Sequence, residues 1–268
     1  MKSNKKIVPS SYDIIGSKEK AVAIVEIPDE LKNKEKQIAK QIIKRHKNVK
    51  TVLKKTSERT SIFRTRNYKY ILGDINTEII HIEHGYKLKL DPKKVYFSGR
   101  EGTERIRIAE QVKPKENIML MFAGICPYGI AIAKKQPSVK IIAIEINPNA
   151  YEYMKENIRI NKISERIIPV LGDVKVKSKD WYGKCNRVIM PLPHDSYKFL
   201  NIAYKCLKPK SGYIHMYAIE EEKNVKVNVK KIIDKFQKRI NREINFKIRK
   251  ILPYSPQKNK YCIDLRLS

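Results

Sequence analysis

A glycine turn and a carboxylate, about twenty residues apart, point most directly to chemistry in this sequence. The apolar run 117–122 leads into Gly124-Ile-Cys-Pro-Tyr-Gly129, and a second apolar run, 140–144, ends in Glu145. A glycine turn after a strand lets the backbone approach a ligand closely, and a carboxylate after the next strand can accept hydrogen bonds from a ribose diol. The pattern therefore predicts a site for a nucleoside-type cofactor.

Two more loops follow expected strands in the same way. Asp173 comes after the run 167–171, where a carboxylate can accept a hydrogen bond from an adenine amino group. The segment Met190-Pro-Leu-Pro193 follows the next strand and predicts a rigid lip beside the group to be transferred. Each loop alone is equally compatible with an ordinary connection, but three of them at successive strand ends favour a cofactor site.

The second glycine of the dinucleotide fingerprint is replaced. In G-x-G-x-x-G the middle glycine makes room for a pyrophosphate, and here that position is Cys126. The replacement disfavours a nicotinamide or flavin dinucleotide. S-adenosylmethionine has no pyrophosphate and needs room only for its methionine moiety, so it remains compatible with the turn. An ordinary strand-to-helix turn is the alternative interpretation.

The pattern of apolar residues predicts two domains. Residues 1–100 read as a small α+β domain, and residues 101–268 read as alternating strands and helices, which is typical of an α/β parallel sheet with helices on both faces. In the second part we expect helices at 103–112, 129–135, 148–161, 195–207 and 226–240, and strands at 117–122, 140–145, 167–171, 186–191 and 212–218. Two β runs, 246–251 and 261–267, predict a C-terminal antiparallel hairpin. Such a hairpin is characteristic of class I (Rossmann-like) S-adenosylmethionine methyltransferases.

The composition points to a polyanionic partner. The chain of 268 residues has 58 Lys and Arg against 28 Asp and Glu, a formal net charge of +30. A charge of this size opposes compactness unless it meets a polyanion, and RNA or DNA is the expected partner. A lysine-rich proteome is the alternative explanation. The basic segment 34–55, which contains His46, predicts either contact with an RNA backbone or a solvated helix face.

Cysteine spacing and hydropathy argue against metal-binding, disulfide-rich, membrane and secreted proteins. The four cysteines are scattered without a CxxC pair, which disfavours a zinc site or a disulfide framework. We find neither an apolar run long enough to span a bilayer nor an apolar signal core after the N-terminus. The expectation is a cytoplasmic, metal-free protein without membrane contact, acting as a monomer.

At this point the sequence resembles the archaeal and eukaryotic tRNA (guanine-N1)-methyltransferases, which modify the guanosine 3′ of the anticodon, position 37. The resemblance is carried by Pro9-Ser-Ser-Tyr-Asp-Ile-Ile-Gly16, Phe63-Arg-Thr-Arg66, Val95-Tyr-Phe-Ser98, Arg100, Thr103-Glu-Arg105, Met121-Phe-Ala-Gly124 and Ile144-Glu-Ile-Asn-Pro148. It covers nearly the whole chain, and related enzymes of wyosine biosynthesis share the same core. It implies S-adenosylmethionine as methyl donor and tRNA as partner.

The resemblance also implies roles for individual residues. Glu104 matches the general base that removes the proton from guanine N1, and Arg64 matches the arginine that positions the purine. The substrate-binding positions match Tyr96, Arg100 and Arg105. The cofactor positions match Phe122, Gly124, Glu145, Ile146, Asp173 and Pro191. Without the resemblance, Glu104 is equally an acid in the first turn of a helix and Arg64 a surface or phosphate-contacting residue.

Two positions depart from the family pattern. Leu120 stands where the family usually has an aspartate before Met-Phe-Ala-Gly, and Pro191 stands where many N1-methyltransferases have an asparagine before Leu-Pro. The proline resembles the archaeal bifunctional subtype, which also methylates carbon C7 of 4-demethylwyosine at the same tRNA position. The sequence therefore leaves a second methylation open.

Three other functions remain as alternatives. The related aminocarboxypropyl transferases use the same cofactor but transfer its other carbon arm, and retention of Arg64 and Glu104 favours methyl transfer over this reaction. A catalytically silent tRNA-binding protein is suggested by Leu120 and Cys126 and disfavoured by the three acids Glu104, Glu145 and Asp173. A nicotinamide enzyme fits least, because of the lost glycine and the C-terminal hairpin.

Overall fold

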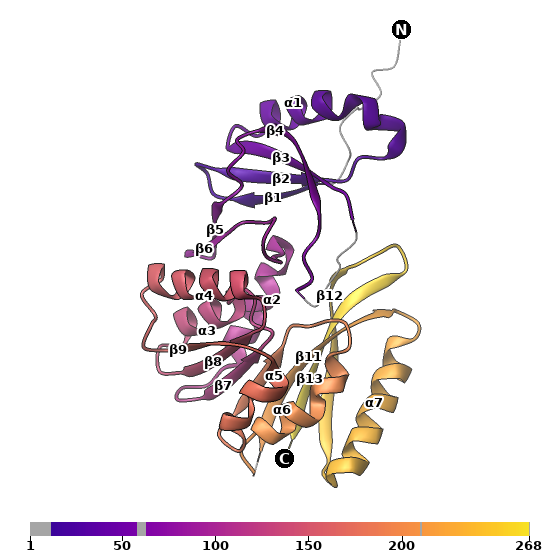
Figure 1. Ribbon diagram of the computed structural model, residues 1–268. Coiled ribbons are helices and arrows are strands. Elements are labelled where there is room, and N and C mark those ends of the chain that lie inside the picture. The colour runs from indigo at the N-terminus through magenta and orange to yellow at the C-terminus, as the bar shows by residue number, and fades with distance from the viewer. Residues whose placement is uncertain (1–11, 58–62, 210, 268) are drawn as a thin grey trace. The chain divides into compact units, whose positions relative to one another are not determined.

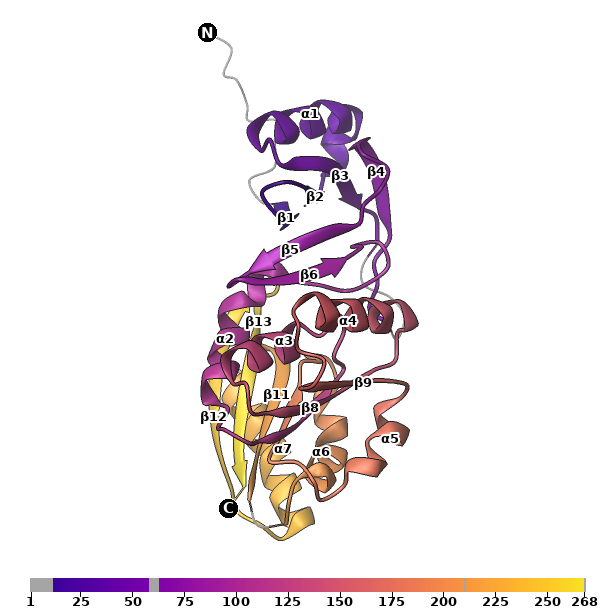
Figure 2. The same ribbon diagram turned by 90° about the vertical axis from the view of Figure 1, so that its left-hand side faces the viewer.

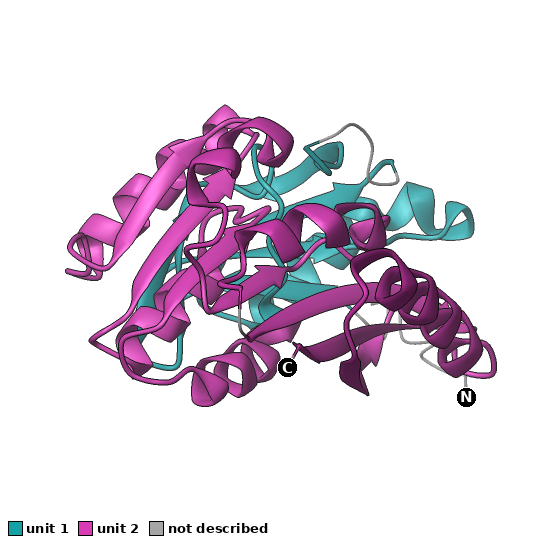
Figure 3. Ribbon diagram, turned by 90° about the horizontal axis from the view of Figure 1, so that it is seen from below, with its two compact units in different colours: residues 1–99 teal, residues 100–268 magenta. Residues whose placement is uncertain are grey.

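The computed structural model describes residues 12–57, 63–209 and 211–267, so residues 9–11 of the first family motif lie outside the described residues. The chain divides into two compact units, residues 1–99 and residues 100–268 (Figure 3). Within the described ranges, no helix is both long and apolar enough to cross a membrane.

Unit 1 contains a four-stranded sheet covered by a helix (Figure 1). Its strands are β1 (Tyr12–Gly16), β2 (Ala21–Val25), β3 (Val49–Lys55) and β4 (Tyr68–Gly73), in that spatial order, and β2 with β3 is the parallel pair. The 3-10 helix η1 (Asp29–Lys34) continues into α1 (Glu35–Arg45). Ile38, Ala39 and Ile42 of α1 are fully buried in a core with β2 and β3, which agrees with their three- and four-residue spacing.

A separate hairpin completes unit 1. It consists of β5 (Ile79–Glu83) and β6 (Tyr86–Leu90), joined by His84 and Gly85, which both have positive φ angles of 45° and 82°. The alternation of apolar residues from 86 to 97 predicts strands on both sides of the turn at Asp91-Pro92, but only the first of them, β6, is a strand. The amides of Lys94 and Val95 both donate to the carbonyl of Asp91, so this segment turns locally and does not extend. Strands β1 and β4 were not expected from the sequence.

Unit 2 is built on a seven-stranded sheet with the spatial order β12-β13-β11-β10-β7-β8-β9. The strands are β7 (Asn117–Met121), β8 (Lys140–Glu145), β9 (Ile167–Leu171), β10 (Arg187–Met190), β11 (Gly212–Glu221), β12 (Ile244–Pro253) and β13 (Lys258–Leu267). Strands β7 to β11 are parallel, and β13 pairs antiparallel with both β11 and β12. The predicted class I methyltransferase sheet with its C-terminal hairpin is confirmed.

Helices cover both faces of this sheet (Figures 1 and 2). They are η2 (Gly99–Glu101), α2 (Gly102–Gln111), α3 (Pro127–Lys135), α4 (Pro148–Ile160), α5 (Val174–Lys177), η3 (Lys179–Trp181), η4 (Ser196–Phe199), α6 (Leu200–Cys206) and α7 (Val225–Ile240). Helices α2, α3 and α4 lie on one face, and α5, α6 and α7 lie on the other. Alternate residues of the strands, such as Met119, Met121 and Met190, pack with α6 and α7 in one core.

Candidate active site

The carboxyl ends of β7, β8, β9 and β10 lie at the same edge of the sheet, because these strands are parallel and in register. Strand β8 ends in Glu145, and the loops that follow β7, β9 and β10 contain Gly124, Asp173 and Pro191, respectively. The structure therefore places these four predicted cofactor residues along one edge, which is where ligands bind in open α/β sheets.

The side chain of Glu145 connects the loop after β7 with the loop after β8. One carboxylate oxygen accepts a hydrogen bond from the amide of Gly124 at 2.7 Å, and the other accepts one from the amide of Asn147 at 2.8 Å. Burial raises the pKa of Glu145, and the amides of Asn147, Gly124 and Ile146 oppose this rise. Because each carboxylate oxygen has more than one lone pair, both remain able to accept from a ribose hydroxyl.

The turn after β7 has an unusual backbone. Phe122, Gly124 and Cys126 all have positive φ angles, of 57°, 57° and 68°. Cys126 is the residue before α3, and its side chain is buried against Gly129: a Cβ built on Gly129 would lie 2.4 Å from the Cys126 sulfur. Position 129 therefore has to be glycine, because Cys126 stands where the fingerprint has its middle glycine and its sulfur fills the space of a Cβ. Burial raises the pKa of the Cys126 thiol to about 12, so the side chain is uncharged.

The remaining cofactor positions border this edge. Asp173 is exposed and accepts a hydrogen bond from the amide of Lys175 at 2.8 Å, which caps α5. At Pro191 the chain makes a tight turn in which the amide of Leu192 donates to the carbonyl of Met190 at 2.7 Å. Phe122 packs edge-on against Phe199.

These residues fit S-adenosylmethionine. A Cβ built on Gly124 would meet nothing within 4 Å, so there is open space beside the turn. The side chain of Ile146 is half-buried and offers apolar surface, whereas Glu145 and Asp173 offer the oxygen atoms that nucleoside hydroxyl and amino groups require.

A second group of polar residues surrounds Glu104, whose side chain is 3% exposed in the first turn of α2. Its Oε1 accepts from Arg107 Nη2 at 2.8 Å and from the Tyr217 hydroxyl at 2.6 Å, whereas Oε2 accepts from Arg107 Nε at 2.6 Å. Arg107 also donates to both oxygens of Asp264, at 2.7 and 3.2 Å. One guanidinium group therefore bridges two carboxylates, and these bonds raise the pKa of Arg107 although burial lowers it.

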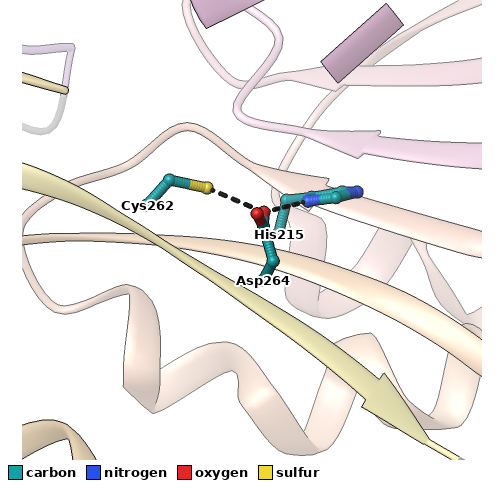
Figure 4. A group of neighbouring side chains, drawn as sticks. All are labelled: His215, Cys262 and Asp264. Carbon is teal, nitrogen blue, oxygen red and sulfur yellow. Dashed lines mark hydrogen bonds and ion pairs between the residues drawn. The ribbon is translucent and has the colours of Figure 1, made fainter. Parts of the chain in front are cut away.

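The network continues from Asp264 to His215 (Figure 4) and from His215 to Arg187. Arg187 Nη1 lies 2.6 Å from His215 Nε2, and arginine has no acceptor, so Nε2 accepts and Nδ1 carries the proton. Nδ1 then donates to Asp264 at 2.6 Å. Burial lowers the pKa of His215, and the neutral imidazole agrees with this shift. Arg187 ends the network in a buried ion pair with Glu116 at 2.7 Å.

Three potential metal ligands, His215, Cys262 and Asp264, have ligand atoms within 4.8 Å of one another (Figure 4). The guanidinium groups of Arg107 and Arg187 bond directly to two of them. A metal cation here would lie beside two positive charges, and burial raises the pKa of the Cys262 thiol and so disfavours the thiolate. We therefore assign the three residues to the hydrogen-bond network.

Two predicted substrate residues come together in unit 1. The guanidinium of Arg64 lies 5.5 Å from the ring centroid of Tyr96, a cation–π distance. Arg64 has a positive φ angle of 54°, which is uncommon for residues other than glycine. Both side chains line a small cavity of unit 1 together with Val95 and Phe97.

The comparisons with known proteins cover nearly the whole chain. Residues 79–248 match the TRM5/TYW2 methyltransferase domain, and residues 2–77 match the TYW2 N-terminal domain. The chain belongs to the TRM5/TYW2 methyltransferase family.

Three curated relatives of this family represent three activities. The tRNA (guanine(37)-N(1))-methyltransferase Trm5b of Pyrococcus abyssi is 39% identical over 98% of this chain and 77% of its own length. The tRNA(Phe) (4-demethylwyosine(37)-C(7)) aminocarboxypropyltransferase of Methanocaldococcus jannaschii is 36% identical over 81% of this chain and 85% of its own. The tRNA (guanine(37)-N(1))/4-demethylwyosine(37)-methyltransferase Taw22 of Nanoarchaeum equitans is 30% identical over 84% and 89%.

Two solved structures of TRM5/TYW2 proteins show the same fold. The complex of aTrm5 with tRNALeu has a TM-score of 0.83 at 34% identity and covers all of this chain and 76% of that one. Pyrococcus horikoshii TYW2 in complex with MeSAdo has a TM-score of 0.83 at 27% identity and covers 98% and 92%.

In this TRM5/TYW2 protein the two other predicted substrate residues differ in exposure. Arg100 is exposed, in η2. Arg105 is 1% exposed, and its guanidinium lies 6.0 Å from the ring centroid of Tyr128. In this conformation Arg105 supports the helix that carries Glu104 and does not present its charge to solvent.

The sequence analysis missed the partners of Glu104, although some signals were present. Arg107 follows Glu104 by three residues, a spacing at which helical side chains meet. Arg187 begins the apolar strand β10, and His215 and Asp264 lie inside β11 and β13. Such residues rarely lie in a core unless they are paired. The pairing itself was not visible, because it depends on the register that sets His215 opposite Asp264.

Proposed function

We propose that this protein methylates N1 of guanosine 37 in tRNA with S-adenosylmethionine as donor. The main observation behind this proposal is that the Glu104 carboxylate accepts three hydrogen bonds. It lies in the same unit as the sheet edge that carries the predicted cofactor residues. Membership of the TRM5/TYW2 family and the activity of the Pyrococcus abyssi relative support this proposal. Residues 101–268 would form the catalytic domain, and residues 1–100 would position the RNA and its target base.

Glu104 acts as the general base in this proposal. Guanine N1 carries a proton at neutral pH, and this proton must leave as the new N–C bond forms. Oε1 already accepts two hydrogen bonds, whereas Oε2 accepts one, so Oε2 is the atom with capacity for the N1 proton. A positioned base of this kind contributes about 10² to 10⁴ in rate.

Arg107 and Tyr217 position that base. A carboxylate paired with an arginine of its own would be a weak base, because the cation stabilises its ionised form. Here the same guanidinium also binds Asp264, so its charge is divided between two carboxylates. The arrangement fixes the direction of the Glu104 lone pairs. Glu104 is also held less strongly by Arg107 than it would be by an arginine that bound no other carboxylate.

Arg64 and Tyr96 receive the purine. As N1 loses its proton, negative charge develops toward O6 of the guanine ring, and the Arg64 guanidinium stabilises this charge. The Tyr96 ring beneath the guanidinium holds it in place. S-adenosylmethionine, when bound along Glu145 and Asp173, supplies the electrophilic methyl group.

Methylation of carbon C7 of 4-demethylwyosine is the finer part of this proposal. Pro191 makes the lip after β10 from backbone alone, without an amide side chain that would bond the base. A lip of this kind suits a tricyclic base as well as guanine. The activity of Nanoarchaeum equitans Taw22 supports the proposal.

Aminocarboxypropyl transfer to 4-demethylwyosine is the second candidate. It is favoured by the match of residues 2–77 to the TYW2 N-terminal domain and by the Methanocaldococcus jannaschii transferase. This reaction would use the same cofactor edge but the other carbon arm of the cofactor. A carbon nucleophile attacks in it, so a base aimed at guanine N1 has no part.

One experiment separates these functions. The protein is incubated with S-adenosylmethionine and one of two tRNAs, carrying guanosine or 4-demethylwyosine at position 37, and the digested nucleosides are weighed by mass spectrometry. We expect a methyl group on guanosine N1, and a methyl group on 4-demethylwyosine if the enzyme is bifunctional. The larger increment of an aminocarboxypropyl group would replace the proposal with the second candidate. No product with either tRNA would support a silent tRNA-binding protein.

The assigned base is tested in the same assay with Glu104→Gln. This variant should lose at least about a hundredfold in kcat, because the amide cannot accept the N1 proton. Glu110→Gln is the matched control, since Glu110 is an exposed acid on the same helix. Equal rates for the two variants would remove Glu104 from the mechanism.

We further propose that the enzyme is of the archaeal type and acts in the cytoplasm as a metal-free monomer. The net charge of +30 opposes association of two copies, and it supports the monomer. Sedimentation of the full chain and elemental analysis of the active preparation test these two points.

A further inference from the structure

A cavity on unit 2 has no part in the proposed reaction. It encloses about 400 Å³ between η4 with the start of α6 on one side and α7 on the other, and we call it the α6–α7 groove. This volume is within the range of sites that hold small organic groups. Helices α6 and α7, which border the groove, lie on the same face of the sheet (Figure 1).

The floor of the groove is apolar, and one wall is aromatic. Leu200, Ile232 and Phe236 line the floor. Tyr197 lines the wall and is 46% exposed, which is unusual for a large ring that has core available nearby. Asn201 supplies an amide group, and the described part of the chain offers it no side-chain hydrogen-bond partner. The Lys198 ammonium lies 6.0 Å from the centroid of the Tyr197 ring, at the edge of cation–π range. Apolar surface, a half-exposed ring and an amide available for hydrogen bonding together match a planar, polar-edged base.

The rim of the groove is positively charged, and α7 supplies three of its four cations. Lys231, Lys235 and Arg239 line it at spacings of four residues, so they follow one side of α7 at intervals of about 6 Å. None of the three has an ion-pair partner among the residues that the structure describes. On the same helix Lys230 does pair, with Asp234 at 3.3 Å.

The fourth cation of the rim, Lys198, pairs with Asp195 at 3.1 Å. Both side chains are more than half exposed, so this ion pair contributes little free energy. A phosphate can therefore replace Asp195 as the partner of Lys198. Among the residues that the structure describes, no carboxylate lines the groove. A row of cations beside a stacking surface is the arrangement by which proteins bind single-stranded nucleic acid.

We propose that the α6–α7 groove binds a single-stranded segment of RNA, with one unstacked base against Tyr197 and the adjoining phosphates along Lys231, Lys235 and Arg239. A second copy of this chain does not suit the groove, because each copy has a net charge of +30. The inference rests on the proposed function only in that the partner is RNA. Binding, which needs no turnover, tests it separately.

The charge of the groove is tested with two triple variants of the full chain. The groove variant is K231Q/K235Q/R239Q. The control K226Q/K238Q/R249Q removes the same charge from exposed positions of α7 and β12 that do not line the groove. Binding of a fluorescein-labelled oligouridine is measured over a range of salt concentrations. We expect the groove variant to bind at least tenfold more weakly and to reduce the slope of log K against log salt by about two, since each single-strand phosphate contact contributes about 0.7.

The stacking surface is tested with Tyr197→Ala and Tyr197→Phe. Loss of the ring should weaken oligouridine binding about fivefold or more, whereas the phenylalanine variant should bind like the unaltered protein. Asn201→Ala should lower the preference among oligonucleotides of different base without changing the salt slope.

Three outcomes would overturn the proposal. Equal losses in the groove and control triples would show that binding depends only on total charge. Equal binding by Tyr197→Ala and Tyr197→Phe would show that no base stacks on the ring of residue 197. Displacement of RNA by oligoglutamate with the same dependence on Tyr197 would assign the groove to an acidic protein segment. All binding is repeated in Glu104→Gln, so that failure of the methylation assay and failure of the groove are distinguished.

Discussion

Unit 2 contains two kinds of cation, buried ones that are paired with carboxylates and exposed ones along the α6–α7 groove. Around Glu104 and Asp264, Arg107 and Arg187 are largely buried and bond to carboxylates at 2.6 to 3.2 Å. Along the α6–α7 groove, the cations of α7 are exposed and have no carboxylate partner within the described chain. The same residue types therefore serve two purposes in one unit.

The difference follows from the cost of desolvation. A buried charge is stable only when it is paired and hydrogen-bonded, so the cations near Glu104 are committed to fixed partners and can orient them. An exposed charge keeps its water and counter-ions, which it releases when a polyanion binds. Loss of a buried cation should therefore reduce stability, and loss of an exposed one should reduce binding.

The largest effect is expected for Arg107→Leu. This change leaves Glu104 and Asp264 without their shared cation, and breaking a buried pair costs about 3–5 kcal/mol of the free energy of unfolding. Urea denaturation measures the loss, with the exposed Arg249→Leu as control. Arg107→Lys should recover only part of it, because an ammonium group cannot bridge both carboxylates in two parallel pairs of bonds. A loss below about 1 kcal/mol would mean that the pair behaves like a surface pair.

A smaller effect is expected for Tyr217→Phe. The change removes the hydroxyl that donates to Glu104 Oε1, a bond to a charged group worth about 1.5–3 kcal/mol. Because Glu104 loses one of the groups that orient it, kcat should fall while KM for S-adenosylmethionine stays unchanged. Tyr213→Phe, on the same strand, is the control and should leave kcat unchanged. If only stability fell and kcat stayed unchanged, Tyr217 would be structural.

His215→Asn should change how stability depends on pH. Burial lowers the pKa of His215 in the folded protein, so below its unfolded value of about 6.5 the unfolded chain binds more protons. The folded protein therefore loses stability as pH falls from this value, by up to about 1.4 kcal/mol per pH unit. The variant should lack this slope in denaturation between pH 5 and pH 7. The exposed His84→Asn, at a positive φ angle that asparagine tolerates, should retain it.

The smallest effect is expected for the stability of K231Q/K235Q/R239Q. Surface substitutions of unpaired residues change the free energy of unfolding by about 0.5 kcal/mol or less. Thermal unfolding of this variant should match that of K226Q/K238Q/R249Q. A loss as large as that of Arg107→Leu would contradict the distinction between the two sets of cations.

The sequence predicted the fold more completely than the site. The alternation of apolar runs identified the strands and helices of unit 2, because each run is long enough to show its period. In unit 1, β4 was missed because its exposed residues, such as Lys69 and Tyr70, interrupt the apolar pattern. Val95 and Phe97 are both buried without forming a strand, so alternation alone was misleading there.

For the site, the loops at the strand ends were predictable and the network behind Glu104 was not. Glu145 is the last residue of its strand, so its position at the edge needs only local information. Arg107 and Asp264 are 157 residues apart, and only the pairing of β13 with β11 brings them together. The roles of the site residues stay predictions until the variants are measured.

The position of β13 has a consequence for how the protein is made. This strand, Lys258–Leu267, lies between β11 and β12 and carries Asp264. During synthesis, residues 117–190 leave the ribosome well before it, so the strands of the cofactor edge are complete while Arg107 still lacks half of its partners. A nascent chain, or one clipped near residue 258, would lack Asp264, so Arg107 would pair with Glu104 alone. The chain thus forms its cofactor edge before the Arg107 charge is shared between two carboxylates.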